Sequence, residues 1–177
     1  GREQEAWLLR ELESSDTRWN LIAQQTLLTP MDNQAGTGRT VWTDGWDGYP
    51  RSQRALIEAL ARPGLSNPLV IGGDLHANVV ANVQADPWGD ARTVAAEVCG
   101  TSMSAQGWPQ SSYEPLRADN PQLLHLNSDE RGYALVEIGR HAEVRLRSPE
   151  TVKQRASAVR TVGHYVVEDG ARGIRRA

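Results

Sequence analysis

A carboxylate and an imidazole follow a short apolar run in the middle of the chain. The run, residues 69–71, ends at Gly72 and Gly73, and Asp74 and His76 come next. Hard divalent cations favour carboxylate oxygens and borderline transition metals accept imidazole nitrogens, so the pair suits one mixed metal site or two adjacent sites. A catalytic metal needs more protein ligands than two. The alternative is a plain turn, in which Asp74 caps backbone amides and His76 has an ordinary hydrogen-bond partner.

The apolar run predicts the element that positions this pair. A few aliphatic residues stopped by glycines are typical of a buried strand. Polar residues just beyond the carboxyl end of a strand lie where α/β sheets bind their ligands. If the strand geometry continued, period-two alternation would aim Asp74 and His76 the same way, and the glycines would let a ligand or another backbone come close. The sequence therefore predicts that both side chains converge at one edge of a sheet.

Periodicity predicts the remaining elements. Apolar stripes indicate a helix at 1–13 and a second helix that begins at Pro50 and ends before Pro63. Residues 77–92 show no periodic spacing of apolar residues and are expected to form a surface loop. Residues 170–177 are expected to form a frayed basic tail. Strands are predicted at 19–23, 93–98, 123–126, 133–138, 143–146 and 159–167. This order predicts an α/β (α+β) domain, with one mixed sheet or two packed β-sheets flanked by helices.

Candidate substrate-binding residues lie in two other loops. Residues 29–50 are too long and too aromatic for a plain connection. Trp42, Trp46 and Tyr49 could form the rim of a ligand cleft, or Trp46 and Tyr49 could anchor the loop onto the core. Arg131 lies in a predicted hairpin bend, where a guanidinium can bind a phosphate through two hydrogen bonds, although an arginine in a turn is more often solvated. We take Trp46, Tyr49 and Arg131 as the candidates.

Composition narrows the class of protein. A chain of 177 residues can bury one sizeable core, and its net charge of -3 gives no general attraction to nucleic acid or to an anionic membrane surface. The single Cys99 rules out an internal disulfide, and no apolar run reaches the roughly 20 residues that span a bilayer. The chain starts inside a helix with neither a cap nor a signal segment, so we expect it to be the remainder of a longer protein.

Several motifs follow one another in a specific order. They are GREQEAWL at 1–8, WNLIAQQ at 19–25, DGWDGYP at 44–50 with Gln53-Arg54, GDLH at 73–76 and RGY at 131–133. In this order the chain resembles the second half of a PhoD-like alkaline phosphatase, and the likeness fades after Arg147. The most specific part is the DGWDGYP segment followed by a GDxH motif. The resemblance favours the metal-ligand interpretation of Asp74 and His76.

The resemblance implies a fold, an activity and a set of metals. Residues 1–177 would be the C-terminal half of one calcineurin-like metallophosphoesterase domain, with two packed β-sheets flanked by helices. The implied activity is hydrolysis of phosphate monoesters, with phosphodiesters also accepted, in the bacterial periplasm or outside the cell. By resemblance, His76 holds an iron-type metal and Asp74 faces a calcium-type metal, both residues are catalytic, and other divalent metals are alternatives. Cys99 cannot replace the family's metal-binding cysteine, because it follows the GDxH motif, and Gln122 stands where many relatives have histidine.

The expected partners follow from the ligands that this chain lacks. The other metal ligands of the family belong to its first half. We therefore expect hydrolysis of a phosphate ester only together with the missing N-terminal half of the same protein, as a separate or cleaved chain. No membrane span is expected, and nucleic acid is expected only as a phosphodiester substrate. The competing class is a non-catalytic binding module that keeps the fold with an incomplete metal site.

Overall fold

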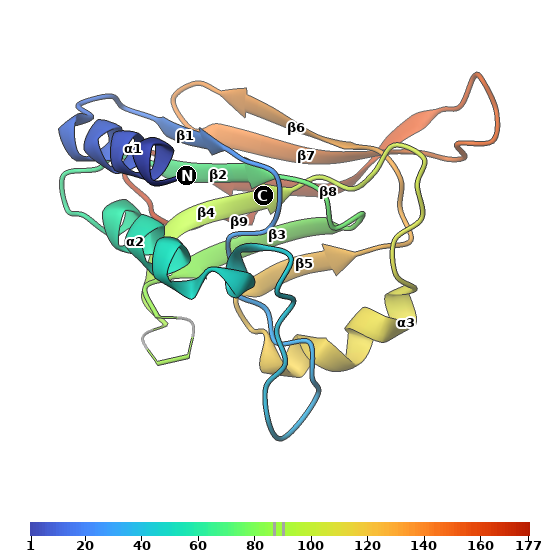
Figure 1. Ribbon diagram of the computed structural model, residues 1–177. Coiled ribbons are helices and arrows are strands. Elements are labelled where there is room, and N and C mark those ends of the chain that lie inside the picture. The colour runs from blue at the N-terminus through green and yellow to red at the C-terminus, as the bar shows by residue number, and fades with distance from the viewer. Residues whose placement is uncertain (87, 90) are drawn as a thin grey trace.

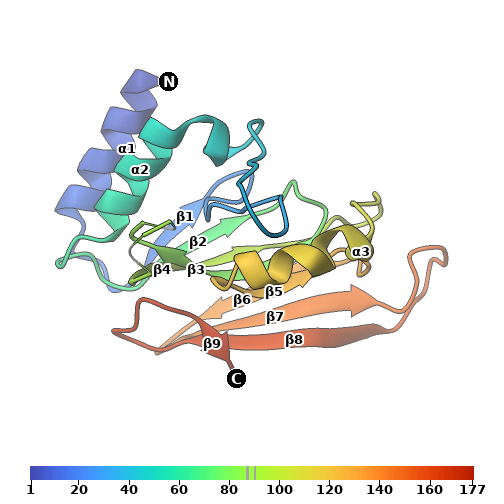
Figure 2. The same cartoon turned by 90° about the horizontal axis from the view of Figure 1, so that it is seen from below.

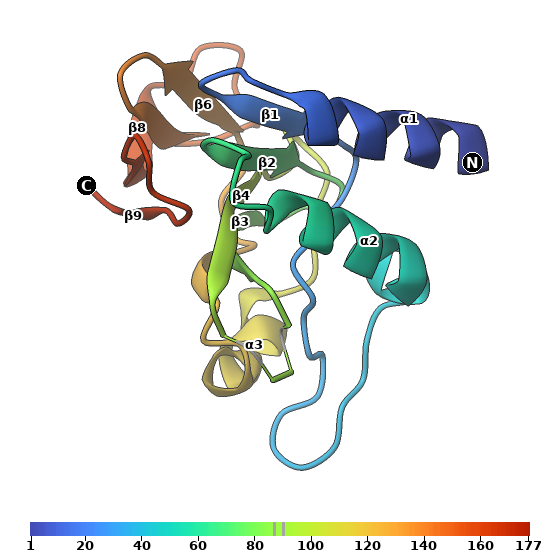
Figure 3. The same cartoon turned by 90° about the vertical axis from the view of Figure 1, so that its left-hand side faces the viewer.

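The computed structural model describes residues 1–86, 88–89 and 91–177. It consists of two β-sheets stacked face to face, with helices α1 (Arg2–Ser14) and α2 (Pro50–Leu60) on the outer side of the first sheet (Figure 1, Figure 2). Figure 3 shows α1 and α2 side by side there. This confirms the predicted mixed α/β domain with two packed sheets flanked by helices.

The order of elements follows the prediction except around residue 80 and at the C-terminus. The strands are β1 (Asn20–Ala23), β2 (Pro68–Gly72), β3 (Asn78–Gln84), β4 (Thr93–Cys99), β5 (Leu123–Asn127), β6 (Tyr133–Ile138), β7 (Ala142–Pro149), β8 (Val159–Val167) and β9 (Arg175–Arg176). The short helices are η1 (Trp46–Gly48), α3 (Gln110–Tyr113) and η2 (Glu114–Asp119). Both long helices and every predicted strand are confirmed, with small differences at their ends.

The first sheet brings distant segments of the chain to one edge. Its strand order is β1-β2-β4-β3-β5, in which β1, β2 and β4 are parallel and β3 is antiparallel to both of its neighbours. Ala23 pairs with Ile71, and Gly72 pairs with Cys99, so the carboxyl ends of the parallel strands lie level. The segments that follow these strands therefore leave the sheet side by side.

Apolar side chains pack on both faces of this sheet. In β2, Leu69 packs between the two sheets, whereas Val70 packs beneath the helices. Both are fully buried, as expected for a strand covered on two faces. A third cluster, which includes Met31 and Tyr113, packs the segment after β1 against β3 and α3. The strand that leads to Asp74 is thus held from both sides.

The expectation of a surface loop at 77–92 is wrong for much of its length. Strand β3 forms there and lies between β4 and β5. The sequence of β3 shows no clear strand pattern, because the strand is largely buried and carries asparagines where an apolar residue is usual. The side-chain oxygens of Asn78 and Asn82 accept hydrogen bonds from backbone amides at 3.2 and 2.8 Å, which satisfies these two acceptors inside the sheet. Pro87 and Asp90, which belong to the same expected loop, lie outside the described residues.

The C-terminal residues 170–177 do not form a frayed tail. They include β9, which pairs with β8, and Ile174, which is buried in the core between the sheets. Arg172 donates hydrogen bonds to the carbonyl oxygens of Leu60 and Arg62, at and just beyond the end of α2. A buried apolar side chain and these hydrogen bonds hold the segment, which a basic composition alone does not reveal.

The outer strands of the two sheets present open edges on the same side of the molecule. Within the described residues, no strand pairs with the free edge of β1 or of β6, which lie together at the top of Figure 1. Leu21 of β1 is 47% exposed, and Leu135 and Ile138 of β6 are 40% and 42% exposed. Open edges with exposed apolar side chains are templates for pairing with further strands.

Candidate functional site

Asp74 and His76 lie on a turn and not on a continued strand. Strand β2 ends at Gly72, and the backbone φ angles of Asp74 and His76 are 67° and 53°, in the left-handed region. Few residues with a Cβ adopt this region, although Asp and His do so more readily than most. The alternation expected of a continued strand therefore does not apply. Both residues nevertheless line one cavity, so their convergence is present but arises from the turn.

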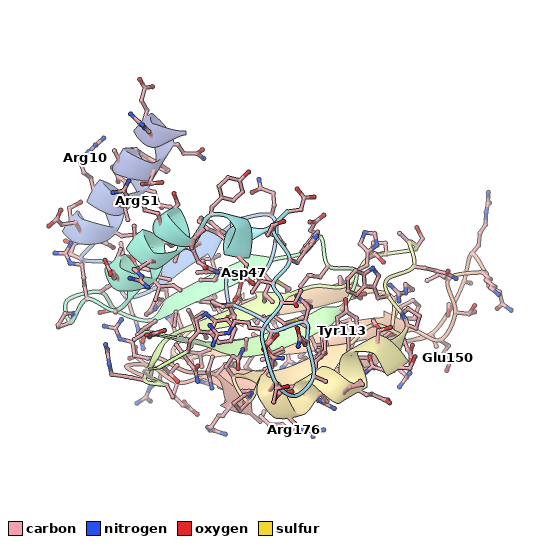
Figure 4. The ribbon with its side chains drawn as sticks, turned by 60° about the horizontal axis from the view of Figure 1, so that its bottom comes forward. Arg10, Asp47, Arg51, Tyr113, Glu150 and Arg176 are labelled. Carbon is pink, nitrogen blue, oxygen red and sulfur yellow. The ribbon has the colours of Figure 1, made fainter. Side chains whose placement is uncertain are left out.

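The cavity has a volume of about 350 Å³ and is built at the edge where the parallel strands end. Segments that follow β1, β2 and β4 form its walls together with η1 and α3, and this size suits a small organic ligand. Figure 4 shows two lining residues, Asp47 of η1 and Tyr113 of α3. The polar and aromatic lining residues are Thr26, Thr29, Asn33, Trp42, Trp46, Asp47, Asp74, His76, Gln106, Trp108 and Tyr113.

Two atoms of the predicted pair that could bind a metal make no hydrogen bond within the described residues. His76 Nδ1 lies 2.9 Å from the carbonyl oxygen of Gln106. A carbonyl oxygen only accepts, so Nδ1 of the neutral ring carries the proton and Nε2 keeps its lone pair. No side chain or backbone group in the described part of the chain makes a hydrogen bond to His76 Nε2 or to the Asp74 carboxylate. The turn in which Asp74 caps backbone amides is therefore not observed.

Two glycines allow backbone segments to meet around the turn. A Cβ on Gly72 would lie 2.5 Å from the carbonyl oxygen of Thr26, and a Cβ on Gly107 would lie 2.6 Å from that of His76. A side chain at either position would force these segments apart. Of the two alternatives expected at Gly72, a ligand or another backbone, the backbone of Thr26 is the one that comes close.

The candidate aromatic residues separate into two groups. Trp46 lines the cavity, packs against the core beneath the helices and donates from Nε1 to Gln24 Oε1 at 3.0 Å, so it is both a wall and an anchor. Tyr49 is 66% exposed and lines a neighbouring groove of about 1000 Å³ along α1 and β1. Trp108 is a further wall residue that no sequence motif marks, and it stacks on Tyr113 with ring centroids 6.2 Å apart.

Arg131 is not among the residues that line the cavity. Its Nη1 lies 3.1 Å from the carbonyl oxygen of His76, 2.9 Å from Ser102 Oγ and 2.9 Å from the carbonyl oxygen of Ala105. Its Nη2 donates to the carbonyl oxygen of Ser128. Its donors bind the backbone beside the His76 turn, so contact between Arg131 and a substrate stays a prediction.

A buried carboxylate supports one wall of the cavity. Glu97 of β4 is 0% exposed and accepts hydrogen bonds from Leu28 N at 2.7 Å, from Thr29 N at 2.8 Å and from Thr29 Oγ1 at 2.6 Å. Burial raises the pKa of Glu97 to about 7. Burial also raises the pKa of Asp47, which accepts a hydrogen bond from Gln53 at 2.8 Å. The only sign of this arrangement in the sequence is a charged residue within an otherwise apolar strand.

Glu97→Gln is expected to change how the free energy of unfolding depends on pH. The folded-state pKa of about 7 lies above the ordinary value of 4.5, so the folded chain holds an extra proton between these values. The contribution of Glu97 to stability is therefore greatest at acid pH, falls as the pH rises from about 4.5 to about 7, and then levels off. The contribution of Glu97 to the free energy of unfolding falls by roughly 3 kcal/mol between acid pH and pH values above about 7. Urea unfolding of both proteins at about pH 5 and about pH 8 measures it.

The matched control for this measurement is Glu58→Gln, because Glu58 is exposed on α2. Its difference from the wild type is expected to be the same at both pH values. If the Glu97→Gln difference is also the same at both, Glu97 does not titrate in this range and the prediction is wrong.

The other histidines lie away from the cavity. His125 packs edge-on against an aromatic ring of the second sheet, with centroids 6.0 Å apart, and burial lowers its pKa. His141 and His164 both contact Glu143 on the second sheet. In the parts of the chain that the structure describes, no group of three or more His, Cys, Asp or Glu side chains is arranged to hold a metal ion. Asp74 and His76 therefore have no third candidate ligand beside them among the described residues.

Comparison with known proteins places the chain in a family. The sequence profile of the PhoD-like phosphatases matches residues 1–146. Alkaline phosphatase D of Bacillus subtilis (strain 168) is 29% identical over 184 aligned residues, which cover 99% of this chain and 31% of that protein. The solved structure of PhoD matches with a TM-score of 0.87 at 27% identity, over 100% of this chain and 35% of the other.

These matches cover the whole site but only part of the relatives. The chain spans about a third of the length of the proteins it matches. The family profile ends at residue 146, close to Arg147, after which the motifs fade. It includes every segment that lines the cavity. This chain belongs to the PhoD-like phosphatase family.

Proposed function

We propose that this chain is the C-terminal portion of a metal-dependent alkaline phosphatase that hydrolyses phosphate monoesters, with phosphodiesters as a second substrate class. One observation carries the proposal: Asp74 and His76 line one cavity with unengaged ligand atoms, at the carboxyl ends of parallel strands. α/β sheets bind ligands at this edge. The cavity volume of about 350 Å³ accommodates a small phosphate ester.

The two residues fit part of a metal centre. The Asp74 carboxylate offers oxygen for a calcium-type ion, and His76 Nε2 offers nitrogen for an iron-type ion, with other divalent metals as alternatives. When bound, such metals polarise phosphoryl oxygens and activate water for attack at phosphorus. The hydrogen bond from His76 Nδ1 to Gln106 keeps Nε2 free for this role. Further ligands are required, and we place them in the N-terminal portion of the protein.

The open edges of the two sheets support a partner of this kind. We propose that the N-terminal half of the same protein, as a separate or cleaved chain, covers the edges of β1 and β6. Strands added there would pair with both edges and bury Leu21, Leu135 and Ile138. The groove along α1 shares Asp74 and Trp46 with the cavity, so a segment seated in this groove would reach the ligand residues.

The proposed location is the bacterial periplasm or the outside of the cell, as the family resemblance implies. Within the described residues, none of the helices has both the length and the apolar character needed to cross a bilayer. Nucleic acid enters this proposal only as a phosphodiester substrate, because a net charge of -3 provides no general attraction to phosphate backbones.

Metal removal tests the proposed function. A chelator is expected to abolish hydrolysis of an aryl phosphate at alkaline pH, and iron together with calcium is expected to restore it. The second candidate is a non-catalytic binding module, favoured by the absence of a group of three or more candidate ligands in the described residues. It predicts no turnover with any divalent metal, even when the N-terminal half is present. That result would overturn the phosphatase proposal.

Trp46→Ala is expected to raise KM for a bulky aryl phosphate by about 3- to 10-fold, with a smaller effect for a small alkyl phosphate, because the indole forms part of the cavity wall. Steady-state kinetics with both esters measures the difference. Trp88→Ala is the matched control, since Trp88 is exposed and is not a wall residue. If Trp46→Ala lowers the yield of folded protein but leaves both kinetic constants unchanged, Trp46 is only an anchor.

A further inference from the structure

Arg131 joins segments that are far apart in the sequence. Its Nη1 lies 3.1 Å from the carbonyl oxygen of His76, 55 positions earlier in the chain. The same nitrogen lies 2.9 Å from Ser102 Oγ and 2.9 Å from the carbonyl oxygen of Ala105, and Nη2 donates to Ser128. These acceptors are neutral, so the contacts are hydrogen bonds from a charged donor, and the acceptors of Nη1 share its two N–H groups.

The loop that Arg131 holds also orients the His76 ring. The carbonyl oxygen of Gln106 accepts the hydrogen bond from His76 Nδ1 at 2.9 Å. Ala105, whose carbonyl oxygen contacts Arg131, directly precedes Gln106 in the chain. Gly107, which follows Gln106, approaches the turn so closely that a Cβ at this position would lie 2.6 Å from the His76 carbonyl oxygen. The guanidinium therefore holds both partners of the hydrogen bond that selects the His76 tautomer.

We propose that Arg131 is a positioning residue that keeps His76 in the tautomer with the proton on Nδ1. The proposal deepens the proposed function, because it rests on His76 Nε2 being the nitrogen offered to a metal. Without the guanidinium, the loop loses its link to the His76 carbonyl oxygen, and Gln106 can move away from Nδ1. A neutral imidazole then places its proton on either nitrogen. Lysine cannot make the same set of contacts, because Nη1 binds the turn and the loop while Nη2 binds Ser128, and the single ammonium nitrogen of lysine has no second arm.

Histidine NMR tests this role without any need for turnover. The protein that carries residues 1–177 is labelled with ¹⁵N-histidine, freed of metal by chelation and held at alkaline pH, and the His76 signals are those lost in His76→Ala. The wild type is expected to show only the Nδ1-protonated ring. Arg131→Lys is expected to add the Nε2-protonated form, and to speed amide hydrogen exchange in residues 101–107 by about 10- to 100-fold. Arg145→Lys is the matched control, because Arg145 pairs with glutamates on the second sheet.

Kinetics adds a second readout. With the N-terminal half present, Arg131→Lys is expected to lower kcat by about 10- to 100-fold with little change in KM, because the residue supports a ligand and does not touch the substrate. An unchanged tautomer and unchanged exchange in a folded Arg131→Lys protein would overturn the proposal. Unfolding of the variant, seen by circular dichroism, would overturn it too, since Arg131 would then support the whole fold. A tautomer change in a protein whose wild type has no phosphatase activity would support the role of Arg131 and contradict the proposed function.

Discussion

Replacing His76 by alanine is expected to lower phosphatase activity by more than about 100-fold, since changes to residues that only support metal ligands already cost 10- to 100-fold. The imidazole Nε2 is the unengaged nitrogen of the cavity turn, so its loss removes a proposed ligand outright. Measurement of kcat/KM for an aryl phosphate, together with bound metal by elemental analysis, checks both consequences. We expect iron to be lost with the activity.

Asp74→Asn separates the two proposed metals. An amide keeps the shape of the side chain but removes its charge, so the calcium-type ion is expected to bind more weakly while iron is retained. His164→Ala is the matched control for His76→Ala, because His164 contacts Glu143 on the second sheet and does not line the cavity. If His76→Ala retains both its metal and its activity, the assignment of His76 as a ligand is wrong.

Residues 1–177 by themselves are expected to show no phosphatase activity, and to gain it only when the N-terminal half is bound. Asp74 and His76 are too few to hold a catalytic metal, and the described residues contain no larger ligand group. The exposed apolar residues on the edges of β1 and β6 also predict poor solubility for the isolated chain. Expression of the chain alone and together with its N-terminal half, followed by metal analysis and an aryl phosphate assay at alkaline pH, measures this dependence.

The isolated chain also provides the outcome that would contradict this prediction. Stoichiometric iron or calcium with robust turnover from residues 1–177 alone would mean that the metal site is built differently from that of the family. The Asp74→Asn and His76→Ala variants of the isolated chain would then show whether the same cavity is used. Retained activity in both would place the site elsewhere.

The sequence by itself determined the helices and strands whose apolar patterns are formed by residues close together in the chain. The apolar run before Gly72, the apolar stripe of α2 and the alternation in β6 and β7 are local patterns, and each produced the predicted element. The GDxH motif singled out Asp74 and His76 as the candidate pair, and both line one cavity in the structure. Motif order also predicted the family, because the motifs are stretches of adjacent residues.

Predictions from local patterns were wrong where contacts with residues far away in the sequence hold a segment in place. Asn78 and Asn82 interrupt the apolar pattern of β3, yet their hydrogen bonds to backbone amides allow the strand to lie inside the sheet. Ile174 and Arg172 hold the C-terminal segment against the core and the end of α2. No pattern among neighbouring residues records these contacts, so a central strand was expected to be a loop and a packed segment to be a frayed tail.

Only the tertiary structure decided how the ligand pair is supported. Placement of β4 between β2 and β3 brings Glu97 to the backbone of Leu28, 69 positions away, and the connection after β5 brings Arg131 to His76, 55 positions away. The left-handed turn at Asp74 and His76 replaces the strand alternation that the sequence predicted. The candidate residues Asp74 and His76 could be located from the sequence because a motif is local. The contacts that support them could not, because they depend on which distant segments the order of strands places side by side.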